Sequence, residues 1–396
     1  MAARTGCGKL ADMTERISSI DAIRGLCLVN IFVNHITLGM LLELSPSKIA
    51  FCDSADIFVL LAGLSTFLAY GPRAGGWDWE AARGRMWRRA LILYFANLIV
   101  IAASFLIFSI GDTGAPPPSI ALTPAVAIES AGAVSYWWHA LTMQQSVGYS
   151  MVLRLYVVLM IVAPIYVWLA AKRFWYPLVP AALIWLAGGH FLLADRDSLT
   201  GELLAMTLLP WQLVFAGGVA LGAAIVQRVA LPRRPWLTAA ALALVAAGTA
   251  FLVIAPHVSP DARLWLEARN ESFWTGISKS YQSPLRLLYL AALAYAFMAL
   301  RNAPFVRLAH RADPDGLLCR LGRRSLRAFA FGAVFALAVD HLLWNMMAAG
   351  WIERGSGGAL IAEIGLAALG LFAMARIAGW RPRKLVTPTG FEPVAY

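Results

Sequence analysis

Charged residues are scarce in this chain, and cysteines are few. Only 14% of its 396 residues are charged, whereas 60% are hydrophobic, and the mean hydropathy is positive. This composition excludes an ordinary soluble domain, in which about a quarter of the residues are charged. Four cysteines are too few for a disulfide framework, and no Cys/His spacing resembles a zinc or haem site. The composition predicts a polytopic membrane protein that holds no metal.

Long apolar runs are plentiful, and several have the length of about 20 residues that crosses a bilayer core. We expect ten transmembrane helices, at residues 22–43, 54–72, 90–110, 149–171, 175–194, 208–227, 236–256, 284–302, 325–347 and 357–378. The moderately apolar stretch 116–147 is not counted, because Glu129 and several prolines interrupt it. The predicted fold class is therefore an all-α bundle of transmembrane helices.

The net charge of +11 is concentrated in alternate connections between these helices. Most Lys and Arg residues fall in the N-terminal segment and in residues 73–89, 172–173, 228–234, 301–327 and 376–384. By the positive-inside rule these segments are cytoplasmic, and both termini are then inside. The partner of the basic charge is thus the lipid bilayer, and no nucleic-acid binding is expected. We expect a cytoplasmic segment 1–20 without a signal peptide, one membrane domain 21–380 and a disordered cytoplasmic tail 381–396.

The first apolar run, "IDAIRGLCLVNIFVNHI" at residues 20–36, carries ionisable side chains that are costly inside a membrane. On a helix Arg24 and His35 share a face, about 16 Å apart along the axis, and Asp21 lies on the same face. Imidazole can take a proton from a hydroxyl group, and a guanidinium can hold a phosphate or carboxylate. In the structural alternative, Arg24 snorkels to the inner interface with Asp21 as its partner and His35 is a packing residue.

Arg followed by ten residues and His, in this stretch, resembles the first-helix signature of membrane acyltransferases of the acyltransferase-3 type. The segments "FCDSADIFVLLAGLSTFLAYG" and "RGRMWRRALILYFANL" narrow the resemblance to the OpgC family. Further segments agree in order: "LRLYVVLMIVAPIYVWL", "LLPWQLVFAGGVALG", "SPLRLLYLAALAYAF" and "LGRRSLRAFAFG". The resemblance covers residues 17–345.

This resemblance implies a bacterial inner-membrane enzyme that transfers an acyl group, succinyl in the family, from cytoplasmic acyl-CoA to hydroxyls of a periplasmic glucan. Acyl-CoA is then a substrate, and no permanently bound cofactor is implied. The catalytic groups carry over to His35, Asp53 and Asp56. Where the family usually has His, Asp and His, this chain has Asn97, Met151 and Tyr289, which cannot take part in proton chemistry.

Ionisable residues of the predicted spans gather toward the outer ends of those spans. They are Asp53, Asp56, Arg154, Arg286, Asp340, His341 and Glu363. Such residues usually face the bundle interior, so an outward-open polar vestibule is expected, although pairing with lipid headgroups would place them equally well.

Two carboxylates and two arginines in this set have specific alternative roles. Asp53 and Asp56 lie on one helical face and could share a proton, or they could cap the helix without further function. Arg154 and Arg286 suit the free carboxylate of a succinyl group, and pairing with Asp340 or Glu363 is the structural alternative.

Two further residues are candidate substrate contacts outside the spans' interior. Trp138, in "SYWWH", offers an aromatic face for a sugar ring or for the membrane interface. Arg88, in "RGRMWRR", could bind coenzyme A phosphates, or it could only fix the membrane orientation.

Two other functions fit parts of this pattern. One is an acetyltransferase acting on another cell-surface glycan or amino sugar. The other is a secondary transporter or glycan exporter, which would also need intramembrane charges but commonly shows inverted repeats with paired Gly or Pro interruptions that we do not find. The sequence gives neither the acyl group, nor the acceptor, nor the oligomeric state.

Overall fold

The computed structural model describes residues 3–379 except for 74–75, 110–127, 129–130, 146–148, 200, 202, 231 and 270–271. Within these residues the chain forms helices, and its β pairing is limited to two isolated bridges, Arg73 with Gly76 and Arg196 with Leu203. The all-α class is confirmed. The predicted tail 381–396 and Glu129 lie outside the described residues.

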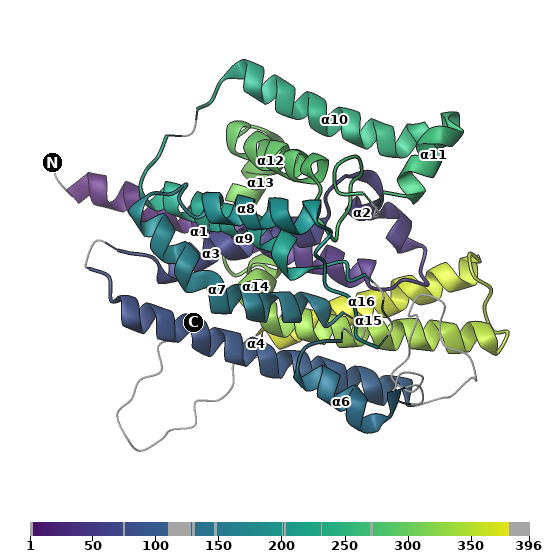
Figure 1. The fold of residues 1–396 in the computed structure, drawn as a ribbon. Helices are drawn as coiled ribbons and strands as arrows, with labels where there is room; N and C mark the ends of the chain where they lie inside the picture. Colours follow the sequence, from purple (N-terminus) through teal and green to yellow (C-terminus); the bar gives the residue numbers. More distant parts are fainter. Residues whose placement is uncertain are drawn as a thin grey trace.

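The helices lie side by side in a bundle (Figure 1). In chain order they are α1 Ala3–Asn34, the 3₁₀ turn η1 Leu41–Leu44, α2 Pro46–Ile49, α3 Ser54–Tyr70, α4 Trp79–Phe108, α6 Ala133–Leu141, α7 Met151–Lys172, α8 Leu178–His190, α9 Leu208–Val226, α10 Pro235–Val258, α11 Pro260–Glu267, α12 Pro284–Ala299, α13 Pro304–His310, α14 Leu317–Arg323, α15 Ser325–Ala348 and α16 Gly357–Gly379.

Several helices are apolar enough to identify a membrane protein. Six of those described, α4, α7, α9, α10, α15 and α16, have the length and composition to cross a membrane, and the bent pair α12 and α13 makes a seventh if it counts as one span. The helices α3 and α8 lie at predicted spans but are shorter. Each predicted apolar run therefore contains a helix, whereas ten crossings and cytoplasmic termini stay predictions.

The first helix differs from its prediction at both ends. It begins at Ala3, so that it includes most of the segment 1–20, and it ends at Asn34 instead of residue 43. After it the chain turns, because carboxylates of distant helices accept its backbone amides. Asp340 on α15 accepts from the amides of Thr37 and Leu38, at 3.1 Å each. Glu363 on α16 accepts from the next pair, Met40 at 2.6 Å and Leu41 at 3.0 Å.

These hydrogen bonds satisfy amides that would otherwise lie unpaired in an apolar environment. We call residues 35–41, together with Asp340 and Glu363, the pinned turn. It leaves His35 at the end of α1, with its backbone amide still bonded to the carbonyl of Ile31 at 3.1 Å.

The helices α3 and α9 cross with their backbones close together. A Cβ atom at Gly63 would overlap the carbonyl oxygen of Phe215, and one at Gly218 would overlap that of Leu60. Small residues at such crossings let two backbones approach closely, which strengthens van der Waals contact where lipid weakens the hydrophobic effect. This crossing fixes α3, whose first residues carry the candidate site.

Candidate functional site

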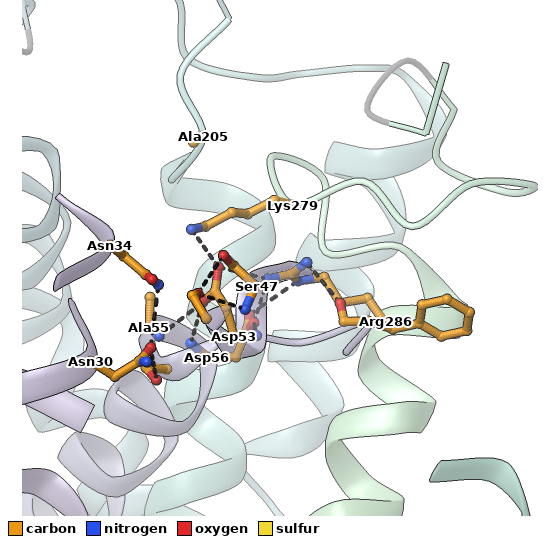
Figure 2. Close-up of polar contacts among 12 residues, drawn as sticks. Asn30, Asn34, Ser47, Asp53, Ala55, Asp56, Ala205, Lys279 and Arg286 are labelled. Atoms are coloured by element: carbon orange, nitrogen blue, oxygen red, sulfur yellow. Dashed lines mark hydrogen bonds and ion pairs between the residues drawn. The ribbon is translucent and has the colours of Figure 1, made fainter. Parts of the chain in front are cut away.

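A compact group of charged side chains surrounds the start of α3 (Figure 2). Arg286, on α12, donates from Nε to Asp56 Oδ1 at 3.2 Å and from Nη2 to Asp56 Oδ2, so its planar fork holds that carboxylate by two bonds. Its Nη2 also lies 3.3 Å from Asp53 Oδ2. Lys279 donates from Nζ to the same Asp53 oxygen at 2.6 Å. We call Asp53, Asp56, Lys279 and Arg286 the charge cluster.

Local structure at the start of α3 orients both carboxylates. Asp53 is the N-cap and accepts from the amide of Ala55 at 2.8 Å, while Asp56 accepts from the amide of Asp53 at 2.7 Å. Such a capping box satisfies amides that the first helical turn leaves open. Gln282 adds a bond to Asp56 at 2.8 Å, and Asp56 is fully buried.

The two carboxylates differ in the cations that contact them. Lys279 and Arg286 both lie beside Asp53 Oδ2, at 2.6 Å and 3.3 Å, and two cations this close favour its ionised form. Each carboxylate has a cation of its own, so nothing in the geometry requires a shared proton. Asp56 has the contacts of a structural carboxylate, and the catalytic role of Asp53 and Asp56 stays a prediction.

The charge cluster is tied to the C-terminal end of α1. Ser54, next to Asp53, donates to Asn30 Oδ1 at 2.8 Å, and Asn34 donates to the same oxygen at 3.3 Å. Asn34 therefore points toward the cluster from the last turn of α1 (Figure 2). His35 follows it, and Lys279 and Asp53 are the two charged groups that act on its imidazole.

The imidazole of His35 is half-buried and held by aromatic rings. The ring of Tyr149 stacks on it with centroids 3.3 Å apart and planes at 14°, and its hydroxyl donates to the carbonyl of His35 at 2.6 Å. Phe329, on α15, meets it edge-on. The ring is thus fixed in position, and its buried Nδ1 is left without a hydrogen bond within the described residues.

Arg24 lies near the middle of α1, at the opposite end of the same stripe from His35. It donates to Ser325 Oγ at 2.7 Å and to Ser65 Oγ at 3.4 Å, and its guanidinium lies over the ring of Phe58. The two stripe residues therefore both contact α15, Arg24 through Ser325 and His35 through Phe329. Arg89, on α4, is close enough for its charge to act on Arg24.

Three other predicted outer residues, Arg154, Asp340 and Glu363, are buried in the bundle. Arg154 is 8% exposed, and its Nη2 lies 3.7 Å from Asp195, a residue of the connection between α8 and α9. Asp340 and Glu363 hold the pinned turn, so neither is the partner of Arg154 or Arg286. The predicted vestibule itself stays a prediction.

The remaining candidates lie apart from the charge cluster. Trp138 is 62% exposed on α6, in an open apolar groove with Val134, Trp137 and Leu141. Arg88 is exposed on α4. The partly buried Asp21 has Arg24 and Arg323 as the nearby charges that act on it.

The three positions that the resemblance sets apart, Asn97, Met151 and Tyr289, are buried or partly buried. Asn97 is fully buried on α4. Met151 begins α7, directly after Tyr149 and Ser150. Tyr289, on α12, forms a hydrogen bond with the hydroxyl of Thr249 at 3.0 Å.

Sequence reasoning missed Lys279 and Tyr149, and within the candidate cluster "RGRMWRR", Arg83 to Arg89, it singled out Arg88 instead of Arg89. The segment 272–283 looks like an ordinary outer connection, and a single lysine in it carries no signal. Arg89 stands next to the predicted Arg88. On a helical projection of α4, Arg89 lies toward the face of the buried residues Met86 and Ala90, whereas Arg88 lies on the opposite face.

Comparison with known proteins gives one result for nearly the whole chain. A family model described as OpgC protein matches residues 16–383. No curated protein and no solved structure matches the chain.

Proposed function

Because the chain belongs to the OpgC family, we propose that it is a membrane O-acyltransferase that moves a succinyl group from cytoplasmic acyl-CoA to hydroxyls of a periplasmic glucan. The observation that carries this proposal is the stripe on α1. The guanidinium of Arg24, near Arg89, lies at one end of this stripe. The imidazole of His35, beside charged groups, lies at the other end, about 16 Å away by helical rise.

His35 is the proposed general base. It takes the proton of an acceptor hydroxyl, whose oxygen attacks the thioester carbonyl carbon and forms the new C–O bond. The tetrahedral intermediate then expels the thiolate of coenzyme A, and the proton on His35 passes to that sulfur. The products are an ester and coenzyme A. Of the two charges near His35, the carboxylate of Asp53 favours its transient positive charge and the ammonium of Lys279 opposes it.

Arg24 and Arg89 are the proposed anchor for the anionic part of the donor. Two guanidiniums close together repel each other, and a phosphate between them relieves that repulsion through charge-assisted hydrogen bonds. The extended arm of coenzyme A would then run along α1 toward His35. Cytoplasmic placement of Arg24 and periplasmic placement of His35 follow the predicted orientation of α1.

Mass spectrometry of periplasmic glucans tests this function. Cells that make the protein should show glucans with added acyl mass and negative charge, and cells that lack it should not. A neutral acetyl increment would replace succinyl in the proposal. Unchanged substitution together with altered glucan export would refute the acyltransferase and favour a transporter.

A further inference from the structure

Lys279 is the cation of the charge cluster that a ligand can reach. Its side chain is 31% exposed, whereas that of Arg286 is 8% exposed. It lies in the segment between α11 and α12, and its ammonium points to the side of Asp53 on which Asn34 lies (Figure 2). An ammonium has three hydrogen donors, of which Asp53 takes one.

The ion pairs of the cluster allow Lys279 to exchange partners. Arg286 already neutralises Asp56 by a two-bond contact, and it reaches Asp53 as well. If the ammonium of Lys279 turns to another anion, Asp53 therefore keeps a cationic neighbour. This matters because a buried carboxylate left without any partner is strongly destabilising.

The local balance of charge favours an incoming anion. Arg269, which follows α11, is close enough to Arg286 for the two like charges to act on each other. Among the described residues Arg269 forms no ion pair. Lys279 and Arg286 contact the two carboxylates, and Arg269 adds a third positive charge near Arg286, so the excess positive charge attracts an anion.

The position of Lys279 connects this anion preference to the acyl group. Its ammonium lies on the side of Asp53 that faces Asn34 (Figure 2), and the next residue, His35, is where the proposed function places the reacting carbonyl. An acyl group with a second carboxylate a few bonds away could present that carboxylate to Lys279 while its carbonyl stays at His35. An acyl group without one gains no such contact.

We propose that Lys279 is the residue that selects a short dicarboxylic acyl group, by pairing with its terminal carboxylate. The inference rests on the proposed function, because it assigns one end of the acyl group to a site whose other end is His35. It differs from the sequence prediction in which Arg154 and Arg286 bind that carboxylate, since Arg286 is already engaged by two carboxylates and Arg154 is nearly buried.

The test measures donor preference in the purified full-length protein. The ratio of kcat/KM for succinyl-CoA to that for acetyl-CoA is compared in the wild type, Lys279→Met and Lys279→Arg. Lys279→Met should lower the ratio by about tenfold or more, the effect of one hydrogen bond between charged groups, mainly through KM for succinyl-CoA. Lys279→Arg should restore most of the preference. Lys48→Met removes another lysine paired with a carboxylate, Glu43, and should leave the ratio unchanged.

Failure of this inference is distinguishable from failure of the proposed function. A Lys279→Met protein that transfers both acyl groups with the wild-type ratio overturns the inference and leaves the function intact. If the wild type transfers neither group, the proposed function fails. Thermal unfolding in the presence of succinate then tests separately whether Lys279 binds a dicarboxylate. Succinate should then raise the Tm of the wild type but not of Lys279→Met, with acetate giving no shift in either. Equal shifts in both proteins, or none, overturn the site.

Discussion

The imidazole of His35 has little freedom to move, because Tyr149 stacks on one face and its hydroxyl holds the adjacent backbone. A base fixed in this way loses little entropy when the acceptor hydroxyl binds. The stack also excludes water from one side of the ring. Catalysis at this position would therefore depend on a residue that contacts no substrate.

Replacement of His35 should separate catalysis from folding. His35→Ala should lower acyl turnover by about 100- to 10,000-fold, because it removes the proton transfer, while the protein stays inserted and abundant. Turnover is measured by the mass of acylated glucan, and abundance by immunoblot. His190→Ala removes an exposed histidine at the end of α8 and should have wild-type turnover. Normal acylation by a stable His35→Ala protein would return His35 to a packing role.

Arg286 is expected to stabilise the folded protein. Arg286→Gln leaves Asp56 fully buried without its cation, which should cost about 3–5 kcal/mol in the free energy of unfolding. Asp56→Asn in the same chain should recover part of this loss, because it removes the unpaired charge. Both are measured by denaturant unfolding in detergent.

Arg263→Gln is the matched control, since Arg263 forms an exposed pair with Glu267. Pairs of that kind are worth less than about 1 kcal/mol. Equal stability of Arg286→Gln and Arg263→Gln would contradict the structural reading of Asp56.

Helix positions were largely predictable, because hydrophobic runs long enough to span a bilayer have few alternatives to a helix. α9, α10, α15 and α16 begin and end within two residues of the predicted bounds. The early end of α1 was not predictable, because the carboxylates that accept its following amides come from more than 300 residues later in the chain. The same reason hid the charge cluster, in which α3 and the segment before α12 meet.

The crossing of α3 with α9 gives a matched pair of glycines. Gly218→Ala places a methyl group against the carbonyl of Leu60 and must push the helices apart, at a cost of about 1–3 kcal/mol. Gly217→Ala meets its nearest atom, Leu60 Cδ1, at 3.6 Å, which is ordinary contact. Thermal unfolding of the two variants should therefore differ, and equal Tm values would mean that the helices are free to separate.

Across the whole molecule, the pinned turn joins the beginning of the chain to its end. A chain that stops after Ser356 lacks α16 and therefore Glu363. The amides of Met40 and Leu41 then lose their acceptor, so residues 37–50 should become sensitive to added protease. Fragment sizes measure this. Glu353→Leu, at an exposed glutamate, should retain full protection, and protection in the truncated chain as well would refute the role of Glu363.

The pinned turn can form only late in the synthesis of the chain. The segment with His35 leaves the ribosome among the first, yet the two carboxylates that shape the backbone after it are made among the last. During translation the nascent chain therefore holds a histidine whose surroundings are unfinished. Only a chain translated past Glu363 can complete these surroundings, so a prematurely released product should be inactive. Its unpaired backbone amides should also make it a substrate for membrane proteases.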